Sequence, residues 1–303
     1  MIFFKIEQDL EECSSLEGYD GESVTVLSFD EMDELIKTNK IDEKLVPHYR
    51  NAQCCKATVH KDSLSGVISV LSKDKKFTRQ SFGFIIHQHR VIFIDDHKIV
   101  PMCMKKMRRN KFHQGIKIGR FLYDFFETLI ETDMRYMEEM SDRLLKMETA
   151  VASGQVENFI LPMAKFRKEV LMFYRYYTQM IDVATELQEN ENGYFSEDDI
   201  QLFNRFSIRA VQLQDETKYL REYSAQVRDA FRNQMEVRRD KKMNILTVVD
   251  AMFTPVMVIA GWYGMNFACM PELQYTYSYP AVICISIISV ILVGWYLKGK
   301  KFW

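Results

Sequence analysis

Two long uncharged stretches near the C-terminus constrain this chain more than any other feature. Ala251–Pro271 carries no formal charge, Leu273–Leu297 carries none either, and only Glu272 separates them. A hydrocarbon core of ~30 Å needs about 20 apolar residues as helix, so each stretch is long enough to span a membrane. The second contains AVICISIISVILVGWYL, which is apolar all round. The alternative, a pair of buried core helices, would need a complete protein coat.

The charges that flank these stretches predict an orientation. RRDKK (Arg238–Lys242) precedes the first and KGKK (Lys298–Lys301) follows the second. Because cytoplasmic flanks favour Lys and Arg, we expect both termini inside a multi-pass protein of the cell (inner or plasma) membrane. The predicted segments are a first span over 243–263, an external loop over 264–279, a second span over 280–297 and a basic cytosolic tail over 298–303.

The rest of the chain predicts an α+β membrane protein with a cytosolic α/β domain over residues 1–114. Runs such as SVTVLSF, CKATVH, GVISVL, SFGFII and RVIFI alternate with turn signals and indicate strands, and FDEMDELIKTN indicates a helix. The start, MIFFKIEQDLEE, has too short an apolar run for a signal peptide. Forty basic against 42 acidic residues give no global bias toward a nucleic-acid partner.

From residue 115 the apolar period becomes helical. Three long helices are predicted over roughly 116–152, 157–190 and 196–262, with a helical bundle or hairpin over 115–195 and a stalk over 196–242. The last helix has no Pro or Gly before Thr254. Its apolar residues recur every seven positions, which indicates coiled packing against copies of the chain or a neighbouring helix. These residues are Phe206, Leu213, Leu220 and Val227.

One face of this helix carries a polar stripe into the first span. Steps of three and four residues keep its members on one side of a helix. They are Asp240, Met243, Thr247, Asp250, Thr254, Met257 and Gly261. A carboxylate facing lipid would cost on the order of 2.5–3.5 kcal/mol, so Asp250 is expected to face protein or water. Several copies around one axis would form a pathway there; the alternative is a structural hydrogen bond near the inner interface.

The short connector GWYGMNFACMPEL (Gly261–Leu273) follows the stripe. Gly264 permits a close turn, and the Asn266 side chain offers a carbonyl oxygen. A ring of such oxygens at the outer mouth would touch the waters of a hard cation such as Mg²⁺, which sheds them reluctantly. Glu272 would add negative charge that concentrates cations outside.

These residues resemble the CorA-type magnesium transporter family. YGMNF (Tyr263–Phe267) followed by MPEL (Met270–Leu273) resembles its signature and loop, and MNILTVVDAMFTPVMVIAGWYGMNF resembles its first span. The resemblance implies a homopentameric funnel in the bilayer that passes Mg²⁺, with Co²⁺ and Ni²⁺ as further ions, down the membrane potential. It places Gly264, Met265 and Asn266 at the entrance. It adds Leu246 to the pore lining and puts Asp240 at the cytosolic neck.

The resemblance also implies gating by cytosolic Mg²⁺ bound to acids between copies. The candidates are Asp95, Asp96, Asp198, Asp199 and Asp215, all of which are equally compatible with solvated turns and helix ends. Asp240 stands where the family usually has Asn, Asp250 where a small residue is common, and Thr254 replaces a bulky apolar residue. A more acidic pore puts a dry apolar gate in doubt.

Three alternatives remain open from the sequence. Zn²⁺ would be the ion of related transporters, and His87 and His89 suggest it, but no Cys/His quartet completes a zinc site. A membrane-anchored enzyme is disfavoured because no phosphate loop, GxSxG elbow or HExxH motif occurs, and no small organic substrate is indicated. A metal sensor or scaffold would bind Mg²⁺ without conducting it.

Overall fold

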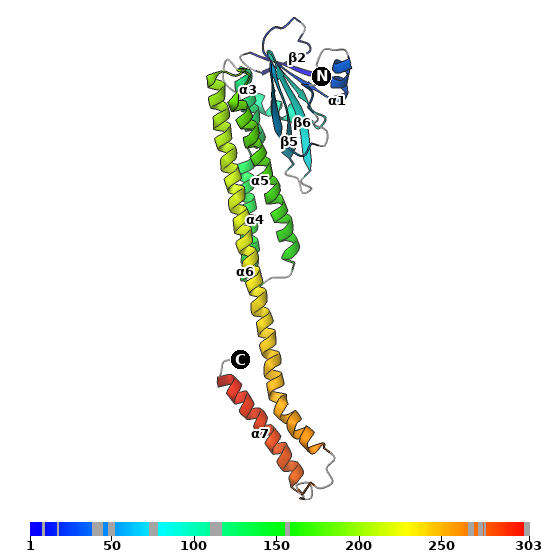
Figure 1. Cartoon of the computed structure of the whole chain (residues 1–303), viewed down its shortest axis with the longest axis vertical. Helices are drawn as coiled ribbons and strands as arrows, with labels where there is room; N and C mark the ends of the chain where they lie inside the picture. Colours follow the sequence, from blue (N-terminus) through cyan, green and yellow to red (C-terminus); the bar gives the residue numbers. More distant parts are fainter. Residues whose placement is uncertain are drawn as a thin grey trace. The chain divides into compact units, whose positions relative to one another are not determined.

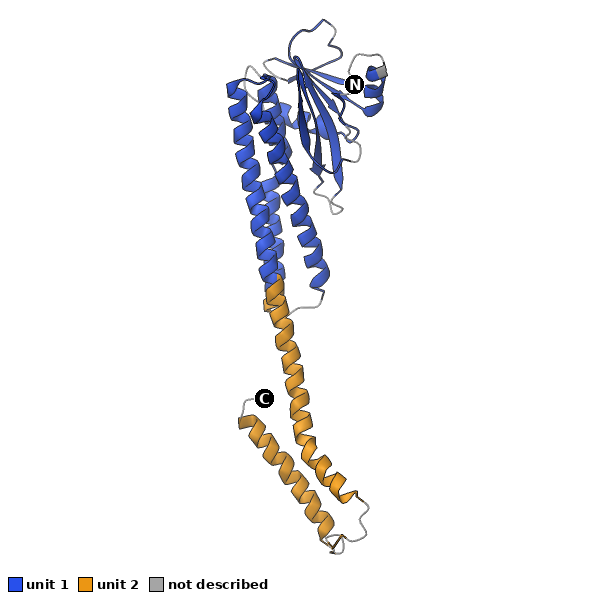
Figure 2. Ribbon diagram, in the orientation of Figure 1, with its two compact units in different colours: residues 1–149, 157–227 blue, residues 150–156, 228–303 orange. Residues whose placement is uncertain are grey.

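The computed structural model describes most of the chain as two compact units (Figure 2). The described residues are 1–7, 10–16, 18–37, 45–47, 52–72, 78–109, 117–154, 158–265, 270–271, 275 and 277–299. Unit 1 comprises residues 1–149 and 157–227, and unit 2 comprises residues 150–156 and 228–303. One helix, α6 (Glu197–Tyr263), contributes residues to both units.

Unit 1 contains a sheet whose described strands are arranged in the order β2-β1-β3-β7-β6-β5-β4. Their bounds are β1 Ile2–Ile6, β2 Leu10–Cys13, β3 Ser23–Leu27, β4 Lys56–His60, β5 Ser63–Leu71, β6 Arg79–His87 and β7 Arg90–Ile94. Only the β3–β7 pair is parallel among these strands. The five predicted strands are all present, and β1 and β2 are additional (Figure 1).

One face of the sheet packs against α3 (Ile118–Ile130) through aromatic rings. Alternate residues of a strand point to opposite faces, so Phe82 and Phe84 of β6 share one face with Phe93 of β7. Phe125 of α3 lies 4.8 Å from Phe93 and 5.7 Å from Phe82 between ring centroids. Phe126 contacts both Phe84 of the sheet and Phe206 of α6. The aromatic layer therefore ties the sheet to the helices of unit 1.

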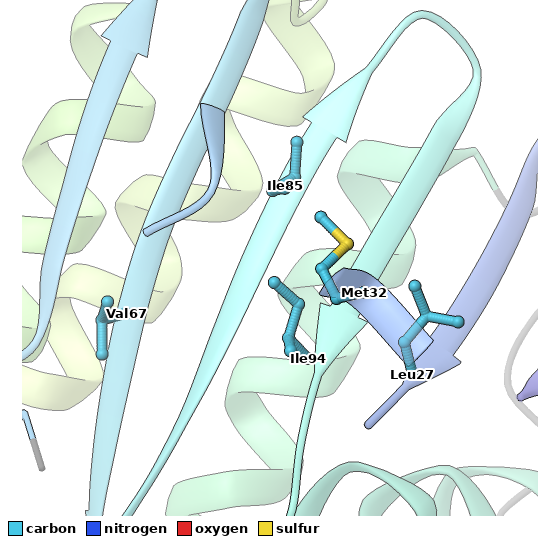
Figure 3. Close-up of a cluster of buried hydrophobic side chains, with 5 residues drawn as sticks. All are labelled: Leu27, Met32, Val67, Ile85 and Ile94. Carbon is cyan, nitrogen blue, oxygen red and sulfur yellow. The ribbon is translucent and has the colours of Figure 1, made fainter. Parts of the chain in front are cut away.

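The opposite face is covered by α1 (Phe29–Lys37). Its Met32, which is 1% exposed, packs with Leu27, Val67, Ile85 and Ile94 (Figure 3). The helix begins with a capping box, because the Ser28 N–H donates to the Glu31 carboxylate and the Glu31 N–H donates to the Ser28 hydroxyl. The predicted α/β character of this region is thus built from two apolar layers, one on each side of the sheet.

The helices after the sheet differ from the prediction in one place. The single helix predicted over 116–152 is two helices, α3 and α4 (Asp133–Ala152). The turn between them lets the buried Asp133 carboxylate accept a hydrogen bond of 2.9 Å from the Tyr177 hydroxyl. The second predicted helix is α5 (Ile160–Glu189), and α2 (Ile99–Arg109) was not predicted.

The heptad residues of α6 pack against neighbouring helices of the same chain. Phe206, Leu213, Leu220 and Val227 are all buried. Gln214 of α6 donates to the Thr178 hydroxyl of α5 at 2.8 Å, and Tyr223 donates to Glu148 of α4. The neighbouring-helix interpretation of this seam is therefore confirmed.

Candidate ion pathway

Unit 2 contains the two helices that are long and apolar enough to cross a membrane, the C-terminal part of α6 and α7 (Ser278–Gly299). Both are almost entirely uncovered by protein within the chain. The predicted second span over 280–297 lies within α7, and the predicted first span over 243–263 is the C-terminal part of α6. A helix that is apolar all round and uncovered requires lipid or further protein around it.

One face of α6 is turned toward α7. Val248 is 5% exposed, and Met252, Pro255 and Ile259, at steps of three and four residues, are half-buried. A Cβ placed on Gly294 of α7 would lie 3.4 Å from the Met252 Cε, so the glycine allows close approach of the two helices. This face is apolar throughout, as expected for a contact between two spans.

The predicted polar stripe lies on the other side of α6. Asp250 follows Val248 by two residues, which places it about 160° around a helix with 3.6 residues per turn. All seven residues of the stripe, and Leu246 beside it, are exposed in the single chain. Met257, for example, is 62% exposed. The helix thus presents a carboxylate, two hydroxyls and a glycine on a face that α7 leaves open.

The hydroxyls of this stripe are tied to the helix backbone. Thr247 donates to the Met243 carbonyl at 2.9 Å, and Thr254 donates to the Asp250 carbonyl at 2.7 Å. Each hydroxyl oxygen therefore keeps its lone pairs free to accept from a donor such as water. Pro255 has no N–H, so it removes the helical hydrogen bond to the Ala251 carbonyl.

The two ends of the stripe are described to different extents. At the C-terminal end, helical hydrogen bonding continues from the Gly264 N–H to the Ala260 carbonyl at 2.9 Å, and the Met265 N–H donates to the Trp262 carbonyl at 3.3 Å. Asn266 and Glu272 lie outside the described residues. At the N-terminal end, Asp240 is exposed, with its carboxylate 3.8 Å from Arg239, and Arg238 donates to the Gly154 carbonyl.

The acids considered as regulatory ligands have structural partners within the chain. Asp95 is buried and accepts the backbone N–H groups of His97 and Val100 at 2.8 and 2.7 Å, at the start of α2. Burial raises the pKa of Asp95, and these backbone hydrogen bonds oppose the rise. Asp96 accepts from the Phe29 N–H at the start of α1. Asp199 forms a capping box with Ser196 at the start of α6.

The remaining two, Asp198 and Asp215, are exposed on α6. Throughout the described part of the chain, no three His, Cys, Asp or Glu side chains come together in a way that could hold a metal ion. The His87 ring nitrogen lies 3.2 Å from the Asp62 carbonyl oxygen at the end of β6, and His89 is exposed in the adjacent turn.

If Asp95 serves as a helix cap, Asp95→Asn should destabilise the protein without altering its response to Mg²⁺. The amide retains one acceptor but presents N–H groups to the other backbone donor, which is left unsatisfied, so the loss is about 1–2 kcal/mol. This corresponds to a Tm about 2–8 °C lower in thermal unfolding. Asp182→Asn, which removes an exposed carboxylate from α5, is the matched control. An unchanged Tm together with a shifted Mg²⁺ dependence of transport would instead identify Asp95 as a metal ligand.

The CorA-like Mg²⁺ transporter protein family matches residues 30–300. The cobalt/magnesium transport protein CorA of Thermotoga maritima is 22% identical over 242 residues, which covers 77% of this chain and 69% of that protein. The zinc transport protein ZntB of Photorhabdus laumondii is 20% identical over 185 residues, covering 61% and 56%.

The solved structure of the CorA magnesium transporter from Methanocaldococcus jannaschii has the same fold. Its TM-score is 0.86 at 17% sequence identity, with 100% of this chain and 98% of that chain covered. The family match spans β4 to β7 of the sheet and helices α2 to α7. The chain has a sheet domain, a 67-residue helix that leads into the first span, and a second span after YGMNF. It belongs to the CorA-like Mg²⁺ transporter family.

Proposed function

We propose that this chain forms a divalent-cation channel that admits Mg²⁺ to the cytosol, with the polar stripe of α6 as its pore lining. One observation carries the proposal: Asp250 lies within a membrane span, on a face that the second span of the same chain does not cover. A carboxylate in that position needs protein or water, because lipid contact is unfavourable. Copies of the chain that present this face to a common axis provide both.

The stripe suits a hydrated cation in its chemistry. Carboxylate and hydroxyl oxygens can accept hydrogen bonds from the water shell of Mg²⁺, which the ion releases reluctantly. Asp240 and Asp250 lie about 15 Å apart along the axis at 1.5 Å per residue, so a ring of each would attract cations at the neck and inside the span. The proposed homopentamer rests on the family resemblance.

Direction and driving force follow from the charged flanks and the membrane potential. RRDKK before the first span and the basic residues after α7 favour a cytosolic location for both termini. The loop with Gly264, Met265, Asn266 and Glu272 then lies outside, where the ion enters. Moving two positive charges inward through 100 mV releases about 4.6 kcal/mol, which is sufficient for passive influx.

Two other functions, a zinc transporter and a non-conducting metal sensor, are distinguished from a magnesium channel by the ion flux that each produces. Relatives named as zinc transporters make Zn²⁺ the alternative ion. A non-conducting sensor would bind Mg²⁺ and leave vesicles impermeable. Gating by cytosolic Mg²⁺ stays a prediction, because the described acids do not form a metal site within one chain.

The test is Mg²⁺ uptake into proteoliposomes that hold an internal Mg²⁺ indicator and an inside-negative potassium diffusion potential. We expect the wild type to take up Mg²⁺ faster than Zn²⁺. Asp250→Asn should lower the initial rate by about tenfold, which corresponds to about 1.4 kcal/mol of lost charge–cation attraction. Asp182→Asn removes an exposed carboxylate from α5 and should conduct as the wild type does.

Intact oligomers that pass no divalent cation at low or high internal Mg²⁺ would overturn the proposal and leave the sensor as the better description. If the wild type takes up Zn²⁺ faster than Mg²⁺, the protein is a zinc channel rather than a magnesium channel. If Asp250→Asn and Asp182→Asn take up Mg²⁺ at the same rate, the polar stripe of α6 does not line the ion pathway.

A further inference from the structure

Unit 1 contains a polar cavity of about 540 Å³ between the sheet and α5 that the ion pathway does not use. Its walls come from the segment before β4, from β6, from the turn before α2 and from one face of α5. The lining residues are Ala52, Gln53, Arg79, Ser81, His97, Met172, Arg175 and Gln179. A volume of this size falls within the range of small-molecule sites, about 300–1,000 Å³.

The charged side chains that line this cavity are positively charged. Arg79 projects from β6 and Arg175 from α5, and His97 adds a third nitrogen-bearing side chain. Among the described residues that line it, none is Asp or Glu. Within the described ranges, neither arginine has a carboxylate within ion-pair distance, although several other arginines do. Two guanidinium groups facing one cavity without a counter-charge repel each other, and an anion would relieve that repulsion.

Amide side chains add further donors. The Gln179 carboxamide oxygen accepts the Cys55 backbone N–H at 3.0 Å, which fixes the oxygen and leaves the NH₂ group of the same side chain as the free end. Gln53 contributes a second amide. Guanidinium groups present N–H donors in a fork that matches the oxygens of a phosphate. The cavity thus holds donors without a matching set of acceptors.

From this arrangement we infer that the cytosolic sheet domain has an anion site that binds a phosphate-bearing small molecule, with Arg79 and Arg175 as its charged ligands. Arg175 and Gln179 are four residues apart, so they lie on the same face of α5, and Arg79 faces them from the sheet. Met172 and Ala52 supply the apolar part of the wall, and none of the described lining residues is aromatic. The site therefore suits a phosphate group on a small polar carrier rather than a stacked base.

The test is isothermal titration of the purified full-length protein in detergent, with EDTA present so that Mg²⁺ does not bridge protein and ligand. The titrants are inorganic phosphate, glycerol 3-phosphate and, as an uncharged comparison, glycerol. Saturable binding of either phosphate compound without binding of glycerol supports the site. Tighter binding of glycerol 3-phosphate identifies an organic phosphate, and equal binding identifies free phosphate.

Two variants and one control make the assignment specific. Arg175→Gln and Arg79→Gln should each weaken binding about ten- to hundredfold, since each removes a charge-assisted hydrogen bond. Arg167→Gln removes the same charge from an exposed position of α5 that does not line the cavity and should bind as the wild type does. The inference is overturned if the wild type shows no saturable binding, or if Arg167→Gln weakens binding as much as Arg175→Gln. Either result is independent of whether the protein conducts Mg²⁺.

Discussion

Replacing Asn266 with alanine is expected to abolish Mg²⁺ uptake, with an initial rate lower by about a hundredfold or more. In the proposed channel every copy contributes one such amide at the outer mouth, so the substitution removes a whole ring of acceptors. Each hydrogen bond to the hydrated ion contributes about 1 kcal/mol, and each 1.4 kcal/mol corresponds to a factor of ten. The measurement is the proteoliposome uptake assay at fixed protein density.

The end of α6 strengthens this expectation. The 67-residue helix ends at Tyr263, and described backbone hydrogen bonds continue to Gly264 and Met265, the residues that precede Asn266 in the sequence. A helix carries a partial negative charge of about −0.5 at its C-terminus. Several such ends at one mouth would attract a cation before the amides contact its waters.

The matched control is Asn204→Ala, which removes the same side chain from an exposed position of α6 in unit 1. Its uptake should equal that of the wild type. Size-exclusion chromatography of both variants shows whether the oligomer is intact. If a correctly assembled Asn266→Ala protein takes up Mg²⁺ at the wild-type rate, the entrance does not lie at YGMNF. The pore lining along α6 is then tested separately by Asp250→Asn.

The membrane part was predictable because its signal is local. α7 is apolar on all sides, and the rest of the chain leaves it almost entirely uncovered. The stripe of α6 was equally visible, since a helical period needs only the spacing of Asp250 and its neighbours. The spacing of residues does not reveal which face of α6 contacts α7. The structure shows that it is the face opposite the stripe, with Val248 and Met252.

The turns and caps of unit 1 depend on contacts between distant residues, which spacing does not reveal. The break between α3 and α4 falls at Glu131 and Thr132, where neither Gly nor Pro occurs. It is accompanied by the contact of Asp133 with Tyr177, which is 44 residues away. The anion cavity was missed for the same reason, because Arg79 and Arg175 are separated by most of the bundle sequence.

Some acids carried a local signal that favours a cap over a metal ligand. Ser196 and Asp199 are three residues apart at the start of α6, and Ser28 and Glu31 have the same spacing at the start of α1. This spacing before an apolar run indicates a capping box. Asp95 had no such signal, since its partners are backbone N–H groups of a helix, α2, that was not predicted.

Arg143→Met is expected to destabilise the bundle by about 3 kcal/mol, because it leaves a buried carboxylate without its counter-ion. Glu169 of α5 is 1% exposed and accepts two hydrogen bonds from the Arg143 guanidinium of α4, at 2.9 and 3.0 Å. Tyr136 donates to the same carboxylate. The hydrogen bond to Glu169 raises the pKa of Arg143, so the guanidinium stays charged in the folded protein.

The expected loss corresponds to a Tm lower by about 6–12 °C in thermal unfolding of the detergent-solubilised protein. Lys106→Met is the matched control, because the Lys106–Glu131 pair has side chains 41% and 46% exposed and solvent screening limits its contribution to less than about 1 kcal/mol. Arg143→Met combined with Glu169→Leu should recover most of the lost Tm, since no buried charge then remains. Equal Tm values for Arg143→Met and Lys106→Met would show that water reaches Glu169 when Arg143 is removed, and the burial of the carboxylate would then contribute little to holding α4 against α5.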